Sequence, residues 1–397
     1  MYQWSRVWGG TDDDVVYGMT TWQDQIYVTG YFSDVVDFNP SDTGALNRAS
    51  AGSHDGFVSA FKSNGDFFWV DTWGSDQIDE GHAVATNSYG FAMVTGFFES
   101  NCDFDSSSGQ DIHTTSLWCP ASFISEYSSI GFWHWTKDWG QGDGSTMAKA
   151  NAIAIDSSDR MFIAGSFTGS ADFNPDTPVE KMTSNGSNDV FLLVTTDAGS
   201  KTMVQTWGGP DDDLGYGIAC DSQSKIYVSG VYQNTVDFNP SPSAEANHTS
   251  NGGYDAFMCL YDWSGNYLDT LTWGGPETDR AMGIAVAPGI RFYIAGDYMG
   301  TVDLDPGVGS DMHTSNGFSD LYISLIDFNG GCLWTRTFGS TDWDAGLGVA
   351  VDPLNSAIFI GNFRLTANFD PSGGTDEHTS NGILDIFVDK ILYDGTW

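Results

Sequence analysis

The sequence predicts an all-β protein: a six-bladed β-propeller of four-stranded antiparallel blades that occupies residues 1–397 as a single domain. An aromatic residue followed by glycine recurs six times at nearly equal intervals. Each interval contains four short strand-like segments, and no stretch has the 3.6-residue apolar period of a helix. A β-solenoid is the rival architecture, but its repeats are usually much shorter. The six repeats begin at Trp8, Trp73, Trp139, Trp207, Trp273 and Phe338.

Each repeat contains the expected strands in a fixed order. The first strand is glycine-rich, as in residues 217–219, and the second is aromatic and β-branched, as in residues 226–230. The third follows an aspartate, as in residues 255–258, and the fourth runs into the next aromatic-glycine marker, as in residues 68–73. Valine, isoleucine, threonine and aromatic side chains favour half-buried pleated surfaces. Turn sequences such as Ser264-Gly265 separate the third strand from the fourth.

The chain begins and ends within one repeat, so we expect its two ends to share the last blade. Gly395–Trp397 begin a fourth strand, and Met1–Trp8 carry the rest of it. The spacing of Trp4 from the marker Trp8 matches the spacing in other repeats. The N-terminal strand should therefore complete the C-terminal blade. Such closure would remove sheet edges that promote aggregation.

The composition is strongly acidic. The net charge is −39, with 14 Lys and Arg, and the 53 acidic residues comprise 46 Asp and 7 Glu. Aspartate is suited to turns and to the ligation of hard cations. A surface of this charge disfavours binding to DNA or RNA, whose phosphates need a basic partner. We find no transmembrane run and no signal peptide at Met1, and expect no membrane insertion.

The five cysteines form no Cys-x-x-Cys motif. Cys102 and Cys119 belong to one repeat and lie on the two sides of one inserted loop. We expect a disulfide between them, which would indicate an oxidising compartment. The alternative is that both are small buried apolar side chains. Cys220 and Cys259 fall on strands that another strand separates, and Cys332 lies beside a turn, so we expect these three to be free thiols.

One repeat carries a recognisable series of motifs: Trp-Gly-Gly-x-Asp-x-Asp at residues 207–213, Ile-Tyr-Val-x-Gly at 226–230, Val-Asp-Phe-Asn-Pro at 236–240, and Thr-Ser-Asn-Gly-x-x-Asp-Ala-Phe at 249–257. This series resembles the SBBP-type β-propeller repeats, and it recurs with variation over essentially the whole chain. The resemblance implies a propeller from a large secreted or surface protein of microbes. The second repeat departs from the pattern, because Ala121 stands where the others have aspartate.

The acidic residues suggest cation sites in the loop between the second and third strands. An Asp-x-Asp/Asn pair stands where this loop begins, and an aspartate stands where it ends. Neighbouring strands would bring the two together, and their oxygens could form part of a Ca²⁺ shell. We therefore expect Ca²⁺ as a cofactor. The candidate ligands are Asp37, Asn39, Asp55, Asp103, Asp105, Asp172, Asn174, Asp189, Asp237, Asn239, Asp255, Asp303, Asp305, Asp320, Asn368, Asp370 and Asp385.

The loop between the fourth strand and the next first strand is also acidic, and antiparallel pairing puts it on the same face. The secondary metal candidates are Asp12, Asp14, Asp211, Asp213, Glu277, Asp279, Asp342 and Asp344. The alternative for both sets is that these side chains cap turns through their own hydrogen bonds.

Other candidates recur less regularly. Histidines precede Thr-Thr or Thr-Ser at His113, His248, His313 and His378, where we favour loop packing over metal ligation. Exposed aromatics that could stack on sugars, or instead pack between blades, are Trp118, Trp133, Trp135, Trp263 and Trp343. No catalytic motif is found, so we expect that the protein is not an enzyme.

Taken together, these features predict an extracellular or cell-surface, calcium-stabilised propeller with a structural or interaction role. It could form a fibre or surface assembly, with a second copy of itself, head to tail, or another surface component as partner. A glycan-binding, lectin-like propeller is the alternative, and a glycosidase or lyase is a third. A lectin should show repeated exposed aromatics, whereas an enzyme should show one polar cluster that breaks the repeat.

Overall fold

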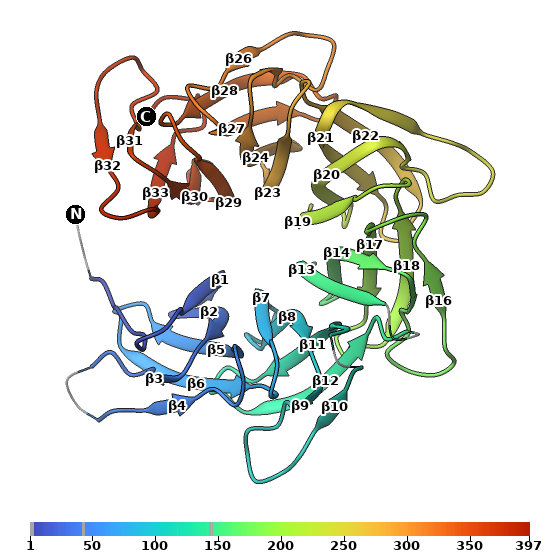
Figure 1. Ribbon diagram of the computed structural model, residues 1–397, viewed down its shortest axis with the longest axis vertical. Coiled ribbons are helices and arrows are strands. Elements are labelled where there is room, and N and C mark those ends of the chain that lie inside the picture. Colours follow the sequence, from blue (N-terminus) through green and yellow to red (C-terminus); the bar gives the residue numbers. More distant parts are fainter. Residues whose placement is uncertain (1–3, 42–43, 117, 143, 145) are drawn as a thin grey trace. The chain divides into compact units, whose positions relative to one another are not determined.

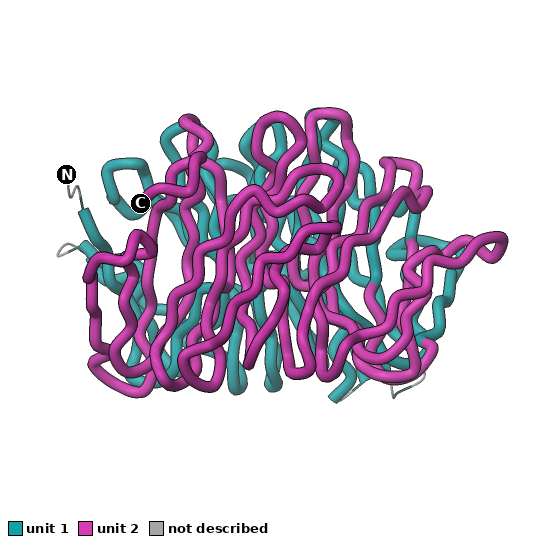
Figure 2. Tube along the Cα trace, turned by 90° about the horizontal axis from the view of Figure 1, so that it is seen from above, with its two compact units in different colours: residues 1–184, 191–204 teal, residues 185–190, 205–397 magenta. Residues whose placement is uncertain are grey.

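The computed structural model describes residues 4–41, 44–116, 118–142, 144 and 146–397. The described residues form strands and turns but no helix, and so no helix that could cross a membrane. The strands form six blade sheets in which consecutive strands pair antiparallel (Figure 1). The predicted fold class, a six-bladed β-propeller, is confirmed. The chain divides into two compact units, coloured separately in Figure 2: residues 1–184 with 191–204, and residues 185–190 with 205–397.

Unit 1 holds the first three blades, although its boundary crosses the last two strands of blade 3. Blade 1 consists of β1 (Val15–Trp22), β2 (Gln25–Phe32), β5 (Asp55–Lys62) and β6 (Phe67–Trp73). Blade 2 consists of β7 (Glu80–Thr86), β8 (Ala92–Phe98), β11 (Ala121–Tyr127) and β12 (Trp133–Trp139). Blade 3 consists of β13 (Met147–Ile155), β14 (Met161–Thr168), β17 (Asp189–Thr195) and β18 (Lys201–Trp207).

Unit 2 holds the other three blades. Blade 4 consists of β19 (Leu214–Cys220), β20 (Ile226–Asp237), β21 (Asn247–Tyr261) and β22 (Tyr267–Trp273). Blade 5 consists of β23 (Asp279–Ala287), β24 (Arg291–Tyr298), β27 (Asp320–Asp327) and β28 (Cys332–Phe338). Blade 6 has three strands among the described residues: β29 (Ala345–Val351), β30 (Ala357–Phe363) and β33 (Asp385–Ile391).

The fourth strand that we predicted for blade 6 stays a prediction. Residues 1–3 lie outside the described part of the chain, and residues 4–8 carry no strand assignment. Nevertheless, the segment is attached to blade 1 in a regular way. Nε1 of Trp4 donates to the carbonyl of Ser63 (2.8 Å), and Nε of Arg6 donates to the carbonyl of Gly65 (2.8 Å).

The loop between the second and third strands forms a small hairpin in every blade. In blade 4 this hairpin is the continuation of β20 and β21. In the other blades it forms a separate two-stranded sheet. These sheets are β3 (Val35–Asp37) with β4 (Asn47–Ala49), β9 (Asn101–Asp103) with β10 (Ile112–Thr114), β15 (Ser170–Asp172) with β16 (Lys181–Thr183), β25 (Thr301–Asp303) with β26 (Met312–Thr314), and β31 (Thr366–Asn368) with β32 (Glu377–Thr379).

The turns between the third and fourth strands confirm the glycine signal. Gly65 and Gly265 have φ of 84° and 81°, a region that glycine enters without steric cost. Nδ2 of Asn64 and the oxygen of Asp262 complete these turns with side-chain hydrogen bonds.

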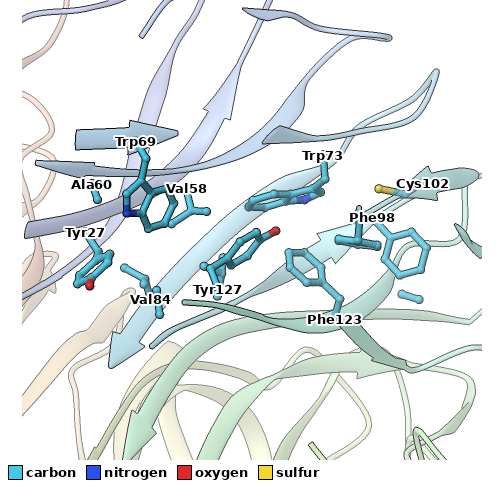
Figure 3. Close-up of a cluster of buried hydrophobic side chains, with 14 residues drawn as sticks. Tyr27, Val58, Ala60, Trp69, Trp73, Val84, Phe98, Cys102, Phe123 and Tyr127 are labelled. Atoms are coloured by element: carbon cyan, nitrogen blue, oxygen red, sulfur yellow. The ribbon is translucent and has the colours of Figure 1, made fainter. Parts of the chain in front are cut away.

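Apolar side chains gather between consecutive blades of each unit. Between blades 1 and 2, the indole of Trp73 packs against Phe123 of β11, with ring centroids 5.4 Å apart and steeply inclined planes (Figure 3). The same cluster contains Val58 of β5 and Val84 of β7. The core thus lies where the face of one blade meets the next, and each blade depends on its neighbour to cover that face.

Candidate functional site

The Asp-x-Asp/Asn motifs close the connecting loop of each small hairpin. Oδ1 of Asp37 accepts hydrogen bonds from the N–H groups of Asn39 (3.0 Å) and Leu46 (2.8 Å). This is the turn-capping role that the sequence left open. The first motif position does the same at Asp103, Asp172, Asp237, Asp303 and Asn368. The second position caps a following turn at Asn39, Asp105, Asn174, Asn239, Asp305 and Asp370.

The aspartates that open the third strands are in a different environment. Asp255 is 1% exposed, and its Oδ2 accepts hydrogen bonds from the main-chain N–H (2.9 Å) and side-chain amide (3.2 Å) of Asn251. Its Oδ1 is buried without a hydrogen-bond partner. The carboxylate lies against Gly274, where an added Cβ would come within 2.5 Å of Cγ. The same arrangement recurs at Asp55, Asp189 and Asp320, opposite Gly74, Gly208 and Gly339. Asp385 also accepts a hydrogen bond from Asn381, but it is less buried.

The second acid of each fourth-to-first loop is also buried. Asp279 is 0% exposed; its Oδ2 accepts from the N–H of Gly275 (2.6 Å) and its Oδ1 from the N–H of Met299 (3.3 Å). It therefore ties its loop to the end of β24. The same contacts are made by Asp79, Asp213 and Asp344, and in a less buried form by Asp14. The outer acids are closer to solvent: Asp12 and Glu277 are exposed, and Asp211 and Asp342 are half-buried.

These two sets of buried aspartates form pairs, each joining the aspartate that opens a third strand to the second acid of the next fourth-to-first loop. In each pair, burial and the charge of one aspartate raise the pKa of the other, and we call them the aspartate pairs: Asp55/Asp79, Asp189/Asp213, Asp255/Asp279 and Asp320/Asp344. Burial raises the pKa of Asp255 to about 6. Burial together with the charge of Asp255 raises the pKa of Asp279 to about 7. The pKa shifts of the other pairs have the same direction, and their main cause is the loss of water around each carboxylate.

The sequence contained a signal for these pairs that our motif reading missed. Where the first member is replaced by Ala121, the position of the second member is occupied by Ala148, so both acids are lost together. The N–H of Ala148 donates to the carbonyl of Pro120, as the N–H of Asp79 does to the carbonyl of His54. The joint loss indicates that the two positions act as a unit, whereas the Asp-x-Asp pair of the same repeat, Asp103 and Asp105, is retained.

The structure does not gather the predicted ligands into larger clusters. Within the part of the chain that is described, no three His, Cys, Asp or Glu side chains converge closely enough to hold a metal ion. The Asp-x-Asp/Asn motifs and the third-strand aspartates thus have separate roles. The aspartate pairs are the remaining oxygen-rich groups, and each offers one buried oxygen without a partner.

The predicted disulfide between Cys102 and Cys119 is wrong, because both are free thiols. Cys102 is fully buried on β9 and belongs to the apolar cluster beside Phe98 (Figure 3). Cys119 lies in the loop before β11, where its Sγ donates to the carbonyl of Gly144 (3.0 Å). Cys102 therefore behaves as the small buried apolar side chain that was the alternative to a disulfide. The remaining three, Cys220, Cys259 and Cys332, are free thiols as predicted.

The recurrent histidines pack within the small hairpins. Nδ1 of His113 lies 2.6 Å from Asp138, Nε2 lies 3.1 Å from Asp111, and the ring meets Phe104 edge-on. Of the candidate tryptophans, Trp133 and Trp135 pack against the apolar clusters of unit 1. The more exposed ones are Trp118 (66%), Trp263 (55%) and Trp343 (37%).

A feature that sequence reasoning missed is a β-bulge in the first strand of every blade. At each bulge the ladder with the second strand shifts register around one extra residue. Such an insertion re-aims the side chain it carries. The bulged residues are Tyr17, His82 and Asn151 in unit 1, and Tyr216, Met282 and Leu347 in unit 2.

The three bulged residues of unit 1 are joined into one polar group. Nδ1 of His82 lies 3.2 Å from Oδ1 of Asn151, and the His82 ring meets the ring of Tyr17 edge-on at 4.9 Å. Nε2 of His82 lies 2.9 Å from Oε2 of Glu80, and burial together with the charge of Glu80 raises the pKa of the neighbouring Tyr17 hydroxyl. Nδ1 of His54 lies 3.5 Å from Oε1 of Glu80. We call Tyr17, His54, Glu80, His82 and Asn151 the unit 1 polar cluster.

The charge of the cluster is balanced internally. Burial raises the pKa of Glu80, but the hydrogen bond and charge of His82 and the charge of Lys149 outweigh it and hold that pKa below its ordinary value. On the other side of the cluster, the ring of Tyr31 stacks on His54 with centroids 4.1 Å apart. The signal that could have revealed the cluster is the variation of these positions among otherwise similar repeats.

Comparisons with known proteins add little. No protein-family model matches the chain. Over 181 residues, 45% of its length, the chain is 26% identical to a protein of Caulobacter vibrioides described as regulatory protein FlaEY. The matched stretch covers 18% of that protein, so the chain spans less than a fifth of the length of this curated relative.

Proposed function

We propose that this chain is a structural β-propeller that works outside the cell, is stabilised by Ca²⁺, and assembles head to tail with further copies of itself. The observation that carries the proposal is the uncovered third strand of blade 6. Ile386 and Val388 on β33 are 83% and 70% exposed. The corresponding residues of β27, Leu321 and Ile323, are both 0% exposed.

The outer edge of β33 is equally open. In the other five blades the third strand pairs with a fourth strand, but among the described residues β33 pairs with β30 alone. An exposed strand edge beside an apolar face invites the addition of a strand from elsewhere. The strand that fits must carry the pattern of the other fourth strands.

Residues 4–8 have that pattern. In unit 2, Trp334 and Arg336 on β28 donate hydrogen bonds to the carbonyls of Tyr393 (3.1 Å) and Gly395 (2.9 Å) in the turn of the following blade. In unit 1, Trp4 and Arg6 make the equivalent hydrogen bonds to the corresponding turn of blade 1. The N-terminal segment therefore sits on blade 1 as a fourth strand of a preceding blade would.

We assign the N-terminal segment of a second copy as the occupant of the β33 edge. Its residues would supply the missing ladder, and the copy that carries it would cover the apolar face of β33. Such a contact joins different surfaces of the two copies, so it is heterologous and extends into a filament unless rotation closes it. The alternative occupant is the same segment of the same chain.

The aspartate pairs support the calcium part of the proposal. Each pair offers carboxylate oxygens, which hard cations prefer, and a buried Oδ1 that no protein donor satisfies. Asp255 and Asp279 would hold such an ion, with main-chain carbonyls or water completing its shell. A bound divalent cation would offset the repulsion between the two carboxylates and part of the net charge of −39. Calcium is abundant outside cells, which agrees with the resemblance to secreted repeats.

The test is a measurement of mass by light scattering and of shape by electron microscopy in Ca²⁺ buffer. We expect assemblies for the wild type, and single chains for a variant that lacks residues 1–8 and for the pair Ile386→Lys and Val388→Lys. Val308→Lys is the matched control, because Val308 is fully exposed and lies between β25 and β26 of blade 5. A wild-type protein that remains a single 43.0 kDa species at all concentrations would contradict the assembly.

A further inference from the structure

We propose that the unit 1 polar cluster binds a neutral sugar residue of a glycan. This inference is independent of assembly through β33, since every residue involved lies in unit 1. It also assigns glycan binding to a site other than the exposed tryptophans considered from the sequence.

The fold does not require polar residues at the bulges. In unit 2 the same positions hold Met282 and Leu347, and the ladders shift register there in the same way. The equivalent positions of Glu80 in unit 2 hold Leu214 on β19, Arg280 on β23 and Ala345 on β29, so an acid is not required there. The blade structure therefore does not explain why these positions are polar in unit 1. Polar groups that converge at one place are typical of a ligand-binding site.

The cluster is held rigidly in position. Both ring nitrogens of His82 are engaged, one with Glu80 and the other with Asn151. The carboxylate of Glu80 is held by His82, and Nδ1 of His54 lies 3.5 Å from it. Such fixed donors and acceptors bind a ligand without a further loss of side-chain freedom. The side-chain amide of Asn151 and the hydroxyl of Tyr17 combine donor and acceptor capacity, which suits the hydroxyl groups of a sugar.

An accessible aromatic surface adjoins these polar groups. Tyr17 is 49% exposed although its ring contacts His82, so part of the ring remains available. The neighbouring ring of Tyr31 lies 5.8 Å from it. An aromatic face packs against the apolar C–H face of a sugar ring, while polar neighbours bind the hydroxyl groups at its edge.

The charge balance favours a neutral ligand. Glu80 is already paired with His82 and is close to Lys149, so it offers no unpaired negative charge to a cation. An anionic ligand would have to approach a protein of net charge −39, which repels it at long range. A polyhydroxylated neutral ligand meets neither obstacle.

The experiment is a titration of the full chain with neutral hexose oligosaccharides. Binding is measured by calorimetry and by the NMR line broadening of the sugar. Polygalacturonate and chitosan serve as the anionic and cationic probes. We expect saturable binding of at least one neutral oligosaccharide by the wild type. The affinity should fall by about 10-fold or more in Tyr17→Ala and in His82→Ala. The matched controls Tyr216→Ala and Met282→Ala change the equivalent bulges of unit 2 and should leave the affinity unchanged.

Folding is monitored separately, so that a lost affinity is attributed correctly. Tyr17→Phe keeps the ring and removes only the hydroxyl, and we expect it to retain a thermal transition and part of the binding. Three results would overturn the proposal: no binding of any neutral sugar by the folded wild type, tighter binding of either charged probe, or equal losses in the variants of the two units. Assembly through β33 would stand in each case, because it is measured by mass.

Discussion

The two units repeat one blade design and differ in what they do with it. Each contains three first strands with a bulge at the same place. In unit 1 the bulges carry Tyr17, His82 and Asn151, which contact one another in series. In unit 2 two of the three bulges carry apolar residues. The bulge is thus a property of the fold, whereas the contacts that join three bulged residues in series are found in unit 1; in unit 2 the charged pair at these positions is Arg280 with Asp297.

The aspartate pairs give the opposite contrast. Unit 2 contains three of them, and unit 1 keeps one and replaces another by Ala121 and Ala148. The pairs recur with the same hydrogen bonds wherever they occur, so they belong to the construction of the repeat. The repeated residues therefore hold the blades, and the glycan site that we propose lies where unit 1 departs from the repeat.

The largest expected effect comes from filling the space that an aspartate occupies. In Gly339→Ala the new Cβ would come within 2.3 Å of Cγ of Asp320, so the buried carboxylate must move. We expect a loss of about 1–3 kcal/mol in the free energy of unfolding, as for other overpacked sites. Urea denaturation followed by tryptophan fluorescence measures it.

The control for this substitution is Gly382→Ala, because a Cβ at Gly382 meets nothing within 4 Å. We expect a change within about 0.5 kcal/mol for it. Gly140 of unit 1 differs from Gly339, because it faces Ala148 and no carboxylate. Its φ of 92° favours glycine, so there the backbone conformation requires the residue. Equal stability of Gly339→Ala and Gly382→Ala would show that the carboxylate is not fixed in the observed position.

The sequence was sufficient for the fold because the fold is periodic. Spacing of the aromatic-glycine markers predicted six blades, and glycine at positions such as 65 and 265 predicted the turns. The aspartate pairs were not predicted, because their members come from separate loops and approach each other only through packing. The polar cluster was not predicted either, since its residues share no motif. Cys102 was misassigned because loop position does not reveal whether a side chain points inward.

Removing one charge from an aspartate pair should change the melting temperature by an intermediate amount. In Ca²⁺, Asp255→Asn should lower the melting temperature, because it removes a proposed ligand. In EGTA at pH 8, the same variant should melt higher than the wild type, because it removes one of two buried like charges. Asp197→Asn, which removes an exposed charge from unit 1, is the control and should change neither value appreciably. The same sign of effect in both buffers would argue against a cation at the pair.

The pH dependence follows from the raised pKa values. The pKa of Asp255 is about 6 and that of Asp279 about 7, both above the ordinary value of 3.8. Their favourable contribution is complete below about pH 4 and is lost as the pH rises through 6 to 7, where the buried groups ionise. In EGTA, the melting temperature of the wild type should therefore fall relative to that of Asp255→Asn between pH 5 and pH 8. Excess Ca²⁺ should reduce this difference. A difference independent of pH would contradict the assignment of the buried charges.

The smallest expected effect concerns the thiols. Cys102 and Cys259 are both 0% exposed, one in each unit, so neither should react with a thiol reagent in the native state. Cys119 is partly exposed and should react, while reaction of the buried pair should wait for unfolding. Because all five cysteines are free thiols, reducing agent should leave the melting temperature unchanged, and Cys119→Ser should behave as the wild type apart from losing its reactive thiol. Recovery of a Cys102–Cys119 peptide under non-reducing conditions would instead support the disulfide that the sequence predicted. The loop of unit 1 that carries Cys119 would then be joined covalently to β9 rather than held by packing alone.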